Sequence, residues 1–116
     1  SQHAQKYAYR VQIAKLWGHR QMLTGPLHID FTFLFPLSKK QKTLNTPNIA
    51  TTNSNMYKKY YHEYRPDLSN LIKMVEDCCI DLIYDDDCII SEITAKKIYG
   101  VTEGTEFTIY QLIGPK

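Results

Sequence analysis

Hydrophobic residues recur at helical spacing in two stretches of the chain. In residues 2–17 the apolar face is expected to consist of Ala4, Tyr7, Ala8, Val11 and Ala14. Gly18 follows as a stop signal. Pro66 and Asp67 open the second stretch, which runs to about Asp81. Its single apolar stripe consists of Leu68, Leu71, Ile72, Val75, Cys79 and Leu82. Both patterns predict amphipathic helices, with Cys79 as a core residue rather than a nucleophile.

Three other stretches alternate between apolar and polar residues, as half-buried strands do. The first runs from Leu27 to Phe35 and has an aromatic inner face, and Pro36 ends it. The others cover residues 88–99 and 105–112, and a turn at residues 100–104 separates them. The order of elements predicts an α+β fold in which a mixed or antiparallel sheet packs against two helices. We expect the last two strands to form a hairpin and residues 1–116 to form a single domain.

A long segment from residue 38 to residue 64 is rich in lysine, asparagine, threonine and tyrosine and has little periodicity, which predicts a loop. Its basic residues, with the arginine that follows it, are Lys39, Lys40, Lys42, Lys58, Lys59 and Arg65. Its tyrosines include Tyr57, Tyr60, Tyr61 and Tyr64. Such a mixture can contact DNA phosphates and unpaired bases. It is equally compatible with a solvated loop that keeps the protein in solution.

Composition restricts the chemistry further. The chain is 43% apolar and 22% charged, which is typical of globular proteins, and its net charge of +2 is too small to identify a nucleic-acid binder. No apolar run approaches the roughly 18 residues of a membrane span, and there is no signal-peptide pattern. The three cysteines form no disulfide or zinc pattern, so we expect a reducing, cytoplasmic setting. The four histidines lack ligand spacing, so carboxylates would hold any metal, which favours magnesium or manganese.

Two acidic positions could serve such a metal: Asp67, at the start of the second helix, and the run 85–87 just past its end. A metal-dependent nuclease needs converging carboxylates and a nearby lysine, and Lys73 supplies that residue type. Each feature also has an ordinary structural explanation. Asp67 fits a helix N-cap, the acidic run fits a solvated turn, and Lys73 fits an exposed polar face. The spacing alone does not bring Asp67 and Asp87 together.

The stretch from Arg65 to Lys73, with the sequence RPDLSNLIK, resembles the helix start P-D-x-D-N-L-x-K of RusA-like endodeoxyribonucleases. The later residues Glu76-Asp77, Tyr84, Asp86-Asp87 and 96–100 continue the likeness, including the paired aspartates before a strand. The resemblance extends over most of the chain. It implies a homodimeric Holliday junction resolvase, commonly encoded in prophages, that acts in DNA recombination and repair. Such an enzyme nicks four-way DNA with Mg²⁺, for which Mn²⁺ is an alternative.

Carried over by position, the resemblance assigns Asp67, Lys73 and Asp87 to catalysis and Asp67, Asp86 and Asp87 to the metal. It also makes the basic residues of the long segment candidate DNA contacts. Ser69 stands where the family has a second aspartate, which removes one expected carboxylate ligand. The family usually has a strand before the first helix, whereas this sequence begins at the helix. The chain is therefore expected to be a fragment or to have a sheet without that edge.

These observations leave three functions open. The first is an active, metal-dependent endonuclease for branched DNA. The second is a catalytically weakened homologue that binds branched DNA but cuts it poorly, because Ser69 replaces a ligand. The third is a protein-interaction module that shares only the fold.

Overall fold

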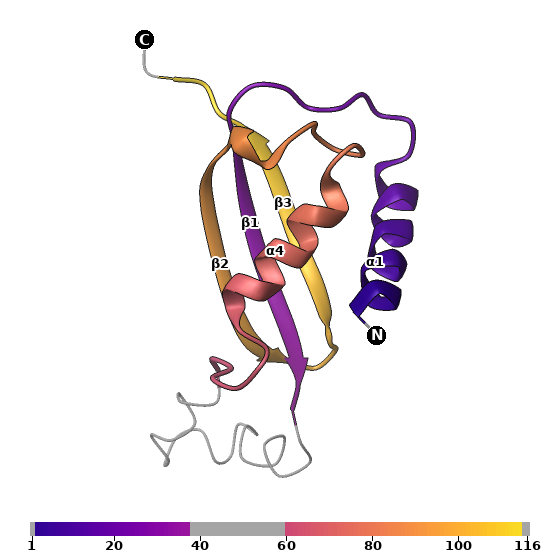
Figure 1. The fold of residues 1–116 in the computed structure, drawn as a ribbon. Coiled ribbons are helices and arrows are strands. Elements are labelled where there is room, and N and C mark those ends of the chain that lie inside the picture. Colours follow the sequence, from indigo (N-terminus) through magenta and orange to yellow (C-terminus); the bar gives the residue numbers. More distant parts are fainter. Residues whose placement is uncertain (1, 38–59, 115–116) are drawn as a thin grey trace.

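The computed structural model describes residues 2–37 and 60–114, with the side chains of Gln2 and His3 excepted. The elements are two helices, one 3₁₀ turn and three strands (Figure 1). In chain order they are α1 (Gln2–Trp17), β1 (Leu27–Pro36), α4 (Leu68–Cys79), η2 (Asp87–Ile89), β2 (Ile90–Gly100) and β3 (Gly104–Gln111). The predicted α+β fold is confirmed, and each predicted element lies within a few residues of an observed one.

The predicted hairpin of the last two strands is wrong, because the sheet order is β2-β1-β3. Strand β1 lies in the middle, parallel to β2 and antiparallel to β3. Its register runs from Leu27 opposite Ile90 and Gln111 to Leu34 opposite Ile98 and Gly104. The most apolar strand of the chain takes the central position, where both of its edges are hydrogen-bonded and its aromatic side chains are covered. The turn between β2 and β3 therefore crosses the end of β1 (Figure 1).

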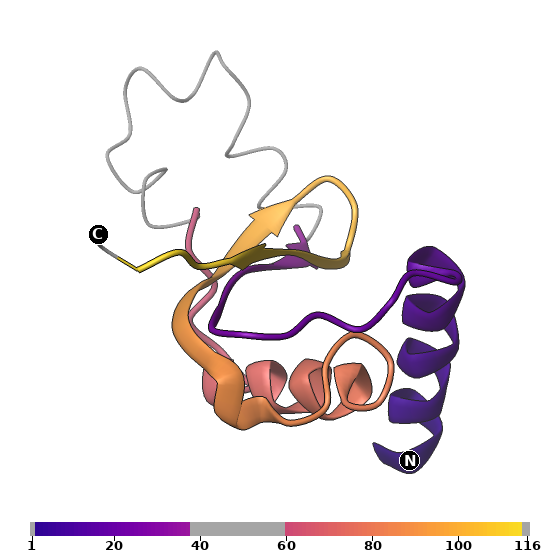
Figure 2. The same cartoon turned by 90° about the horizontal axis from the view of Figure 1, so that it is seen from above.

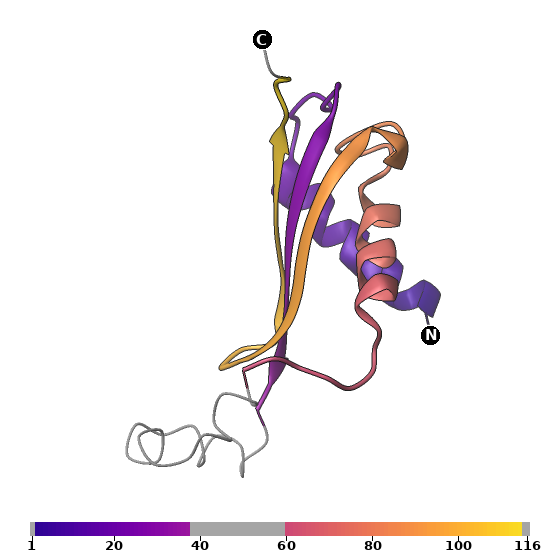
Figure 3. The same ribbon diagram turned by 90° about the vertical axis from the view of Figure 1, so that its left-hand side faces the viewer.

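The core lies between the sheet and α4, which covers one face of the sheet (Figures 2 and 3). The alternate residues Leu27, Ile29, Phe31 and Phe33 of β1 are at most 2% exposed. From the helix side, Val75 and both of its cysteines are buried, as predicted for Cys79. Full burial of side chains of this size contributes about 1.5–3 kcal/mol each. The opposite face of the sheet is not covered by any element in the described ranges.

The predicted inner face of the first helix is wrong. Tyr7 is 71% exposed, whereas Ile13 is 5% exposed and Tyr9 and Trp17 pack against the core. These three residues follow i, i+4, i+8 spacing, so they share one side of α1. They are larger than the alanines of the predicted stripe and remove more apolar area from water. Helix α1 lies beside α4 (Figure 2), and a narrow line of bulky side chains faces the core.

The last residues of the predicted loop pair with the edge of β2 rather than lying free. Tyr61 forms an antiparallel bridge with Ile98, and the Tyr99 amide donates to the Tyr60 carbonyl at 2.9 Å. The Lys97 ammonium then donates to the carbonyls of Tyr64 and Pro66, at 2.6 and 2.9 Å. These bonds hold the segment that leads into α4, so the start of that helix is anchored to the sheet.

Candidate active site

Asp87 is the first residue of η2 and lies where the chain turns from α4 towards β2. Its side chain is partly buried, and its Oδ1 atom is buried without a hydrogen-bond partner among the described residues. Burial raises the pKa of Asp87, and the negative charges of Asp77 and Asp86 raise it further. A carboxylate in this environment is destabilised in its charged form. A cation at Oδ1 would relieve that cost.

Glu76, in the last turn of α4, is a second carboxylate in the same region. Burial raises its pKa, and the next largest causes are the charges of Asp87 and Asp77. The effect of Asp87 on the pKa of Glu76 indicates that the two carboxylates lie within electrostatic reach of each other, although they are eleven positions apart in the sequence. Neighbouring acidic groups with raised pKa values are characteristic of functional sites. The resemblance included Glu76, but the sequence prediction gave it no role in the site.

Lys73 is exposed and lies one helical turn before Glu76 on α4. Its positive charge lowers the pKa of both Asp87 and Glu76, against the larger effect of burial. The structure therefore brings Lys73 and Asp87 into one electrostatic group, as the proposed catalytic roles require. The described residues show no salt bridge that engages the Lys73 ammonium, so it remains free to contact a phosphate.

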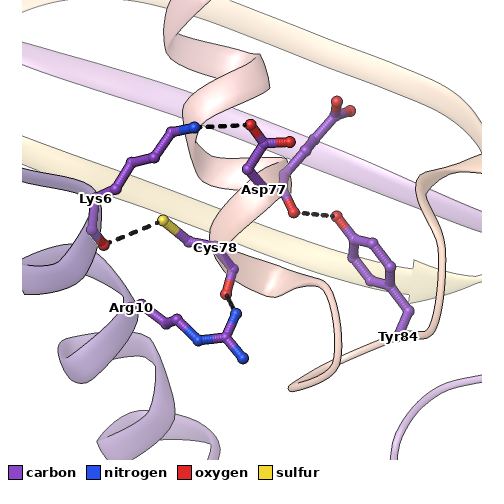
Figure 4. A network of polar contacts seen from close by, with 6 residues as sticks. Lys6, Arg10, Asp77, Cys78 and Tyr84 are labelled. Carbon is purple, nitrogen blue, oxygen red and sulfur yellow. Dashed lines mark hydrogen bonds and ion pairs between the residues drawn. The ribbon is translucent and has the colours of Figure 1, made fainter. Parts of the chain in front are cut away.

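Tyr84 lies close to both Glu76 and Asp87. It is fully buried, and its hydroxyl donates to the Glu76 backbone carbonyl at 3.2 Å (Figure 4). The nearby hydroxyl also lowers the pKa of Asp87, and burial raises the pKa of Tyr84 itself, which keeps the hydroxyl protonated. Tyr84 thus connects the end of α4 to η2. Its position in the sequence likeness was the signal for it, but the alternation pattern gave it no role.

The remaining predicted carboxylates have different positions. The Asp86 side chain accepts a hydrogen bond from the Cys88 amide at 3.0 Å and caps η2. Asp67 is the N-cap residue of α4, yet its side chain makes no capping hydrogen bond. It lies at the opposite end of the helix from Asp87 (Figure 1), and a helix of 12 residues is about 18 Å long. Aspartate is a favoured residue at an N-cap, although the Asp67 side chain makes no capping hydrogen bond.

Ser69 and Arg65 are exposed near the start of α4. The other predicted DNA contacts, Lys39, Lys40, Lys42, Lys58 and Lys59, lie outside the described residues. Lys97, which was not predicted, is instead the cation with a defined position in this region, bound to two backbone carbonyls.

The oxygen atoms around Asp87 are of the kind that binds a hard divalent cation, but few protein ligands are gathered there. Carboxylate oxygens with raised pKa values and an unpartnered buried oxygen suit such an ion. Across residues 2–37 and 60–114, however, no group of three or more histidine, cysteine, aspartate or glutamate side chains is arranged to hold a metal. Mg²⁺ commonly takes only one or two protein carboxylates and completes its shell with water and substrate phosphates. The carboxylates of Asp87 and Glu76 are within the number of protein ligands that Mg²⁺ commonly takes.

A protein-family model described as "Endodeoxyribonuclease RusA" matches residues 1–110. The chain belongs to the RusA endodeoxyribonuclease family. RusA membership implies an endonuclease of the Holliday junction resolvase type, and RusA nucleases generally depend on a divalent metal. No curated protein and no solved structure matches the chain. In the part of this RusA chain that the structure describes, no helix is long and apolar enough to cross a membrane.

Proposed function

We propose that this chain is a magnesium-dependent endodeoxyribonuclease that nicks four-way or other branched DNA during recombination and repair. The observation that carries the proposal is the partly buried Asp87 carboxylate, with one unpartnered oxygen, beside Glu76 and Lys73. A structural aspartate normally has its buried oxygens hydrogen-bonded, because an unsatisfied one costs about 1–3 kcal/mol. Retaining that cost in a family of nucleases is explained by a role in binding the reacting groups.

Each residue has a defined part in this proposal. Asp87 holds the metal, with Glu76 as the adjacent acidic group that increases the local negative potential. Lys73 lies next to both and contacts the scissile phosphate, where its charge offsets the charge that develops during cleavage. Tyr84 holds the end of α4 in place through its hydrogen bond to the Glu76 carbonyl. When bound, Mg²⁺ or Mn²⁺ supplies a polarised water and neutralises phosphate charge.

Asp67 and Asp86 remain part of the proposal as candidate metal ligands. Asp86 adjoins Asp87 and would share its ion, whereas Asp67, about 18 Å away at the other end of α4, would hold an ion of its own. The cleavage assay tests them individually. Loss of cutting in Asp67→Asn without loss of stability would support a ligand role, because the wild-type side chain makes no capping bond that the substitution could remove. The basic residues at 39–59 and Arg65 are proposed DNA contacts.

The assay is cleavage of a labelled synthetic four-way junction by the purified protein with Mg²⁺ or Mn²⁺, beside a linear duplex of the same sequence. We expect metal-dependent paired nicks in the junction that disappear in Asp87→Asn and in Lys73→Met. Lys15→Met, a substitution of an exposed lysine on α1, is the matched control and is expected to cut normally. Tight junction binding without cutting by the wild type would instead favour a weakened homologue.

Two symmetric cuts require two symmetric sites, so the active form is proposed to be a homodimer. Size-exclusion chromatography with light scattering tests this point separately from cleavage. The three free thiols, one of them exposed, are compatible with a proposed cytoplasmic location.

A further inference from the structure

A cleft of about 470 Å³ lies between α1 and α4, on the side of α4 that carries Lys73. Its lining is rich in side chains that can donate hydrogen bonds and includes a single carboxylate, that of Asp77. The polar lining residues are Gln5, Lys6, Tyr9, Asn70, Lys73 and Asp77. Two ammonium groups, two side-chain amides and a phenol suit an anionic ligand with several acceptor oxygens. A DNA backbone phosphate is such a ligand.

Lys6 is the residue of α1 that reaches across this cleft. Its ammonium lies 3.1 Å from Oδ2 of Asp77 on α4, as Figure 4 shows. The Lys6 side chain is nevertheless 45% exposed to solvent. An ammonium has three donors, so one bond to Asp77 leaves others available to a phosphate. An exposed ion pair of this kind contributes at most about 1 kcal/mol to stability, so it does not by itself account for the position of Lys6.

The framework around Lys6 is held by other bonds. The Arg10 guanidinium donates to the carbonyls of Cys78 and Ile80, at 3.2 and 2.9 Å, and so satisfies the C-terminal end of α4. The Cys78 thiol donates to the Lys6 backbone carbonyl at 3.4 Å. These contacts involve the main chain of α1 and α4 and do not need the Lys6 ammonium. Replacing that ammonium should therefore leave the two helices in place.

The cleft and the candidate active site share Lys73. Lys73 lines the cleft and also lies within electrostatic reach of Asp87. Asp77 connects the two in the same way, because it pairs with Lys6 and lies near Asp87. A strand whose scissile phosphate lies at Lys73 and Asp87 would place a neighbouring phosphate in the cleft. Lys6 and Lys73 would then contact successive parts of one backbone.

We infer that the cleft between α1 and α4 is a backbone-phosphate subsite in which Lys6 positions the DNA strand that is cut. This inference rests on the proposed function, since it takes branched DNA as the ligand. Lys6 is a positioning residue here, because it contacts a phosphate away from the one at which cleavage occurs. Asp77 has the opposite effect: it holds Lys6 in the absence of DNA and repels the incoming phosphate.

Lys6 is expected to attract a DNA phosphate and Asp77 to repel it, so their substitutions should have opposite effects on DNA binding. Binding of a fluorescent four-way junction is measured with EDTA present, over a series of salt concentrations, for the wild type, Lys6→Gln, Asp77→Asn and Lys15→Gln. For Lys6→Gln we expect several-fold weaker binding and a decrease of about 1 in the slope of log affinity against log salt. Asp77→Asn should bind at least as tightly as the wild type. Lys15→Gln, an exposed lysine of the same helix, controls for the loss of one positive charge.

A purely structural Lys6 would give a different pattern. Lys6→Gln and Asp77→Asn break the same ion pair, so they would then weaken binding equally and lower the melting temperature together. That result, or a Lys6→Gln that matches Lys15→Gln, overturns the inference while the proposed function stands. Failure of the wild type to bind the junction at low salt overturns both. Thermal unfolding of every variant confirms that the fold is intact.

Discussion

Replacing Asp87 with asparagine should make the protein more stable and less active. The Asp87 carboxylate is partly buried, lies near the negative charges of Asp77 and Asp86, and has one oxygen without a partner. Asparagine is nearly isosteric and uncharged, so it removes the desolvation and repulsion of the charged form. Removing an unfavourable charge from a functional site commonly gains about 1 kcal/mol. For a chain of this length that gain corresponds to a rise in melting temperature of roughly 4 °C.

The pH dependence follows from the direction of the pKa shift. The pKa of Asp87 is raised in the folded protein above its ordinary value of 3.8. The folded state therefore binds the proton more tightly than the unfolded chain does, and the charged form costs stability once the pH is above the raised pKa. The advantage of Asp87→Asn should thus be complete at pH 7 and should shrink as the pH is lowered towards 3.8. Calorimetric melts of both proteins across this range measure it.

Addition of Mg²⁺ provides the second arm of this experiment. Binding at Asp87 would stabilise the wild type and not the variant, so the difference in melting temperature should narrow as Mg²⁺ is raised. A less stable Asp87→Asn at pH 7 would refute the reasoning, because it would show that the carboxylate serves the fold. A stable variant that still cuts junctions would leave the electrostatic argument intact and remove Asp87 from the proposed catalytic group.

Three further outcomes are expected. Ser69→Asp should change the rate of junction cleavage little, because Ser69 lies near the start of α4, away from Asp87. A rate increase of roughly tenfold, which is about 1.4 kcal/mol of activation free energy, would instead favour a weakened enzyme. The hydrogen bond to Asp30 and further acidic contacts raise the pKa of His28, so the stability that His28 contributes should be present below pH 6.5 and lost as the pH rises through the raised value. Urea melts of wild type and His28→Asn at pH 6 and pH 9 measure that loss, and an equal difference at both would contradict it. Thiol labelling followed by mass spectrometry should modify Cys88 in the native protein and Cys79 only after unfolding, because Cys79 is buried and its pKa is raised to about 12.

The helical and strand patterns were sufficient to locate both helices and all three strands of the described ranges, but not the 3₁₀ turn η2. The stripe from Leu68 to Leu82 predicted the buried side of α4, including Cys79, and the alternation from Leu27 to Phe35 predicted β1. Such predictions work because side-chain direction within one element depends on local geometry. The first helix was the exception. The predicted, alanine-rich face and the observed face of Tyr9, Ile13 and Trp17 both follow a helical period. Only the position of the core decides which of the two is buried.

The candidate site was predicted in part. Lys73 and Asp87 followed from their residue types and from the resemblance, which the family match confirmed. The resemblance included Glu76 and Tyr84 but gave them no role, because their roles come from contacts at the end of α4 rather than from spacing. The separation of Asp67 from Asp87 also required the structure. It follows from the chain leaving the C-terminal end of α4 and entering β2 in the opposite direction (Figure 3).

By itself, the sequence determined the elements, their order and the residue types that can serve a metal and a phosphate. Periodicity and turn residues act over a few positions, so they are readable along the chain. The tertiary structure alone decided that β1 lies between β2 and β3, which face of α1 is buried, and which acidic groups lie together. Those outcomes depend on contacts between residues far apart in the sequence. They are set by the burial of the largest apolar side chains, which no local pattern of the chain specifies.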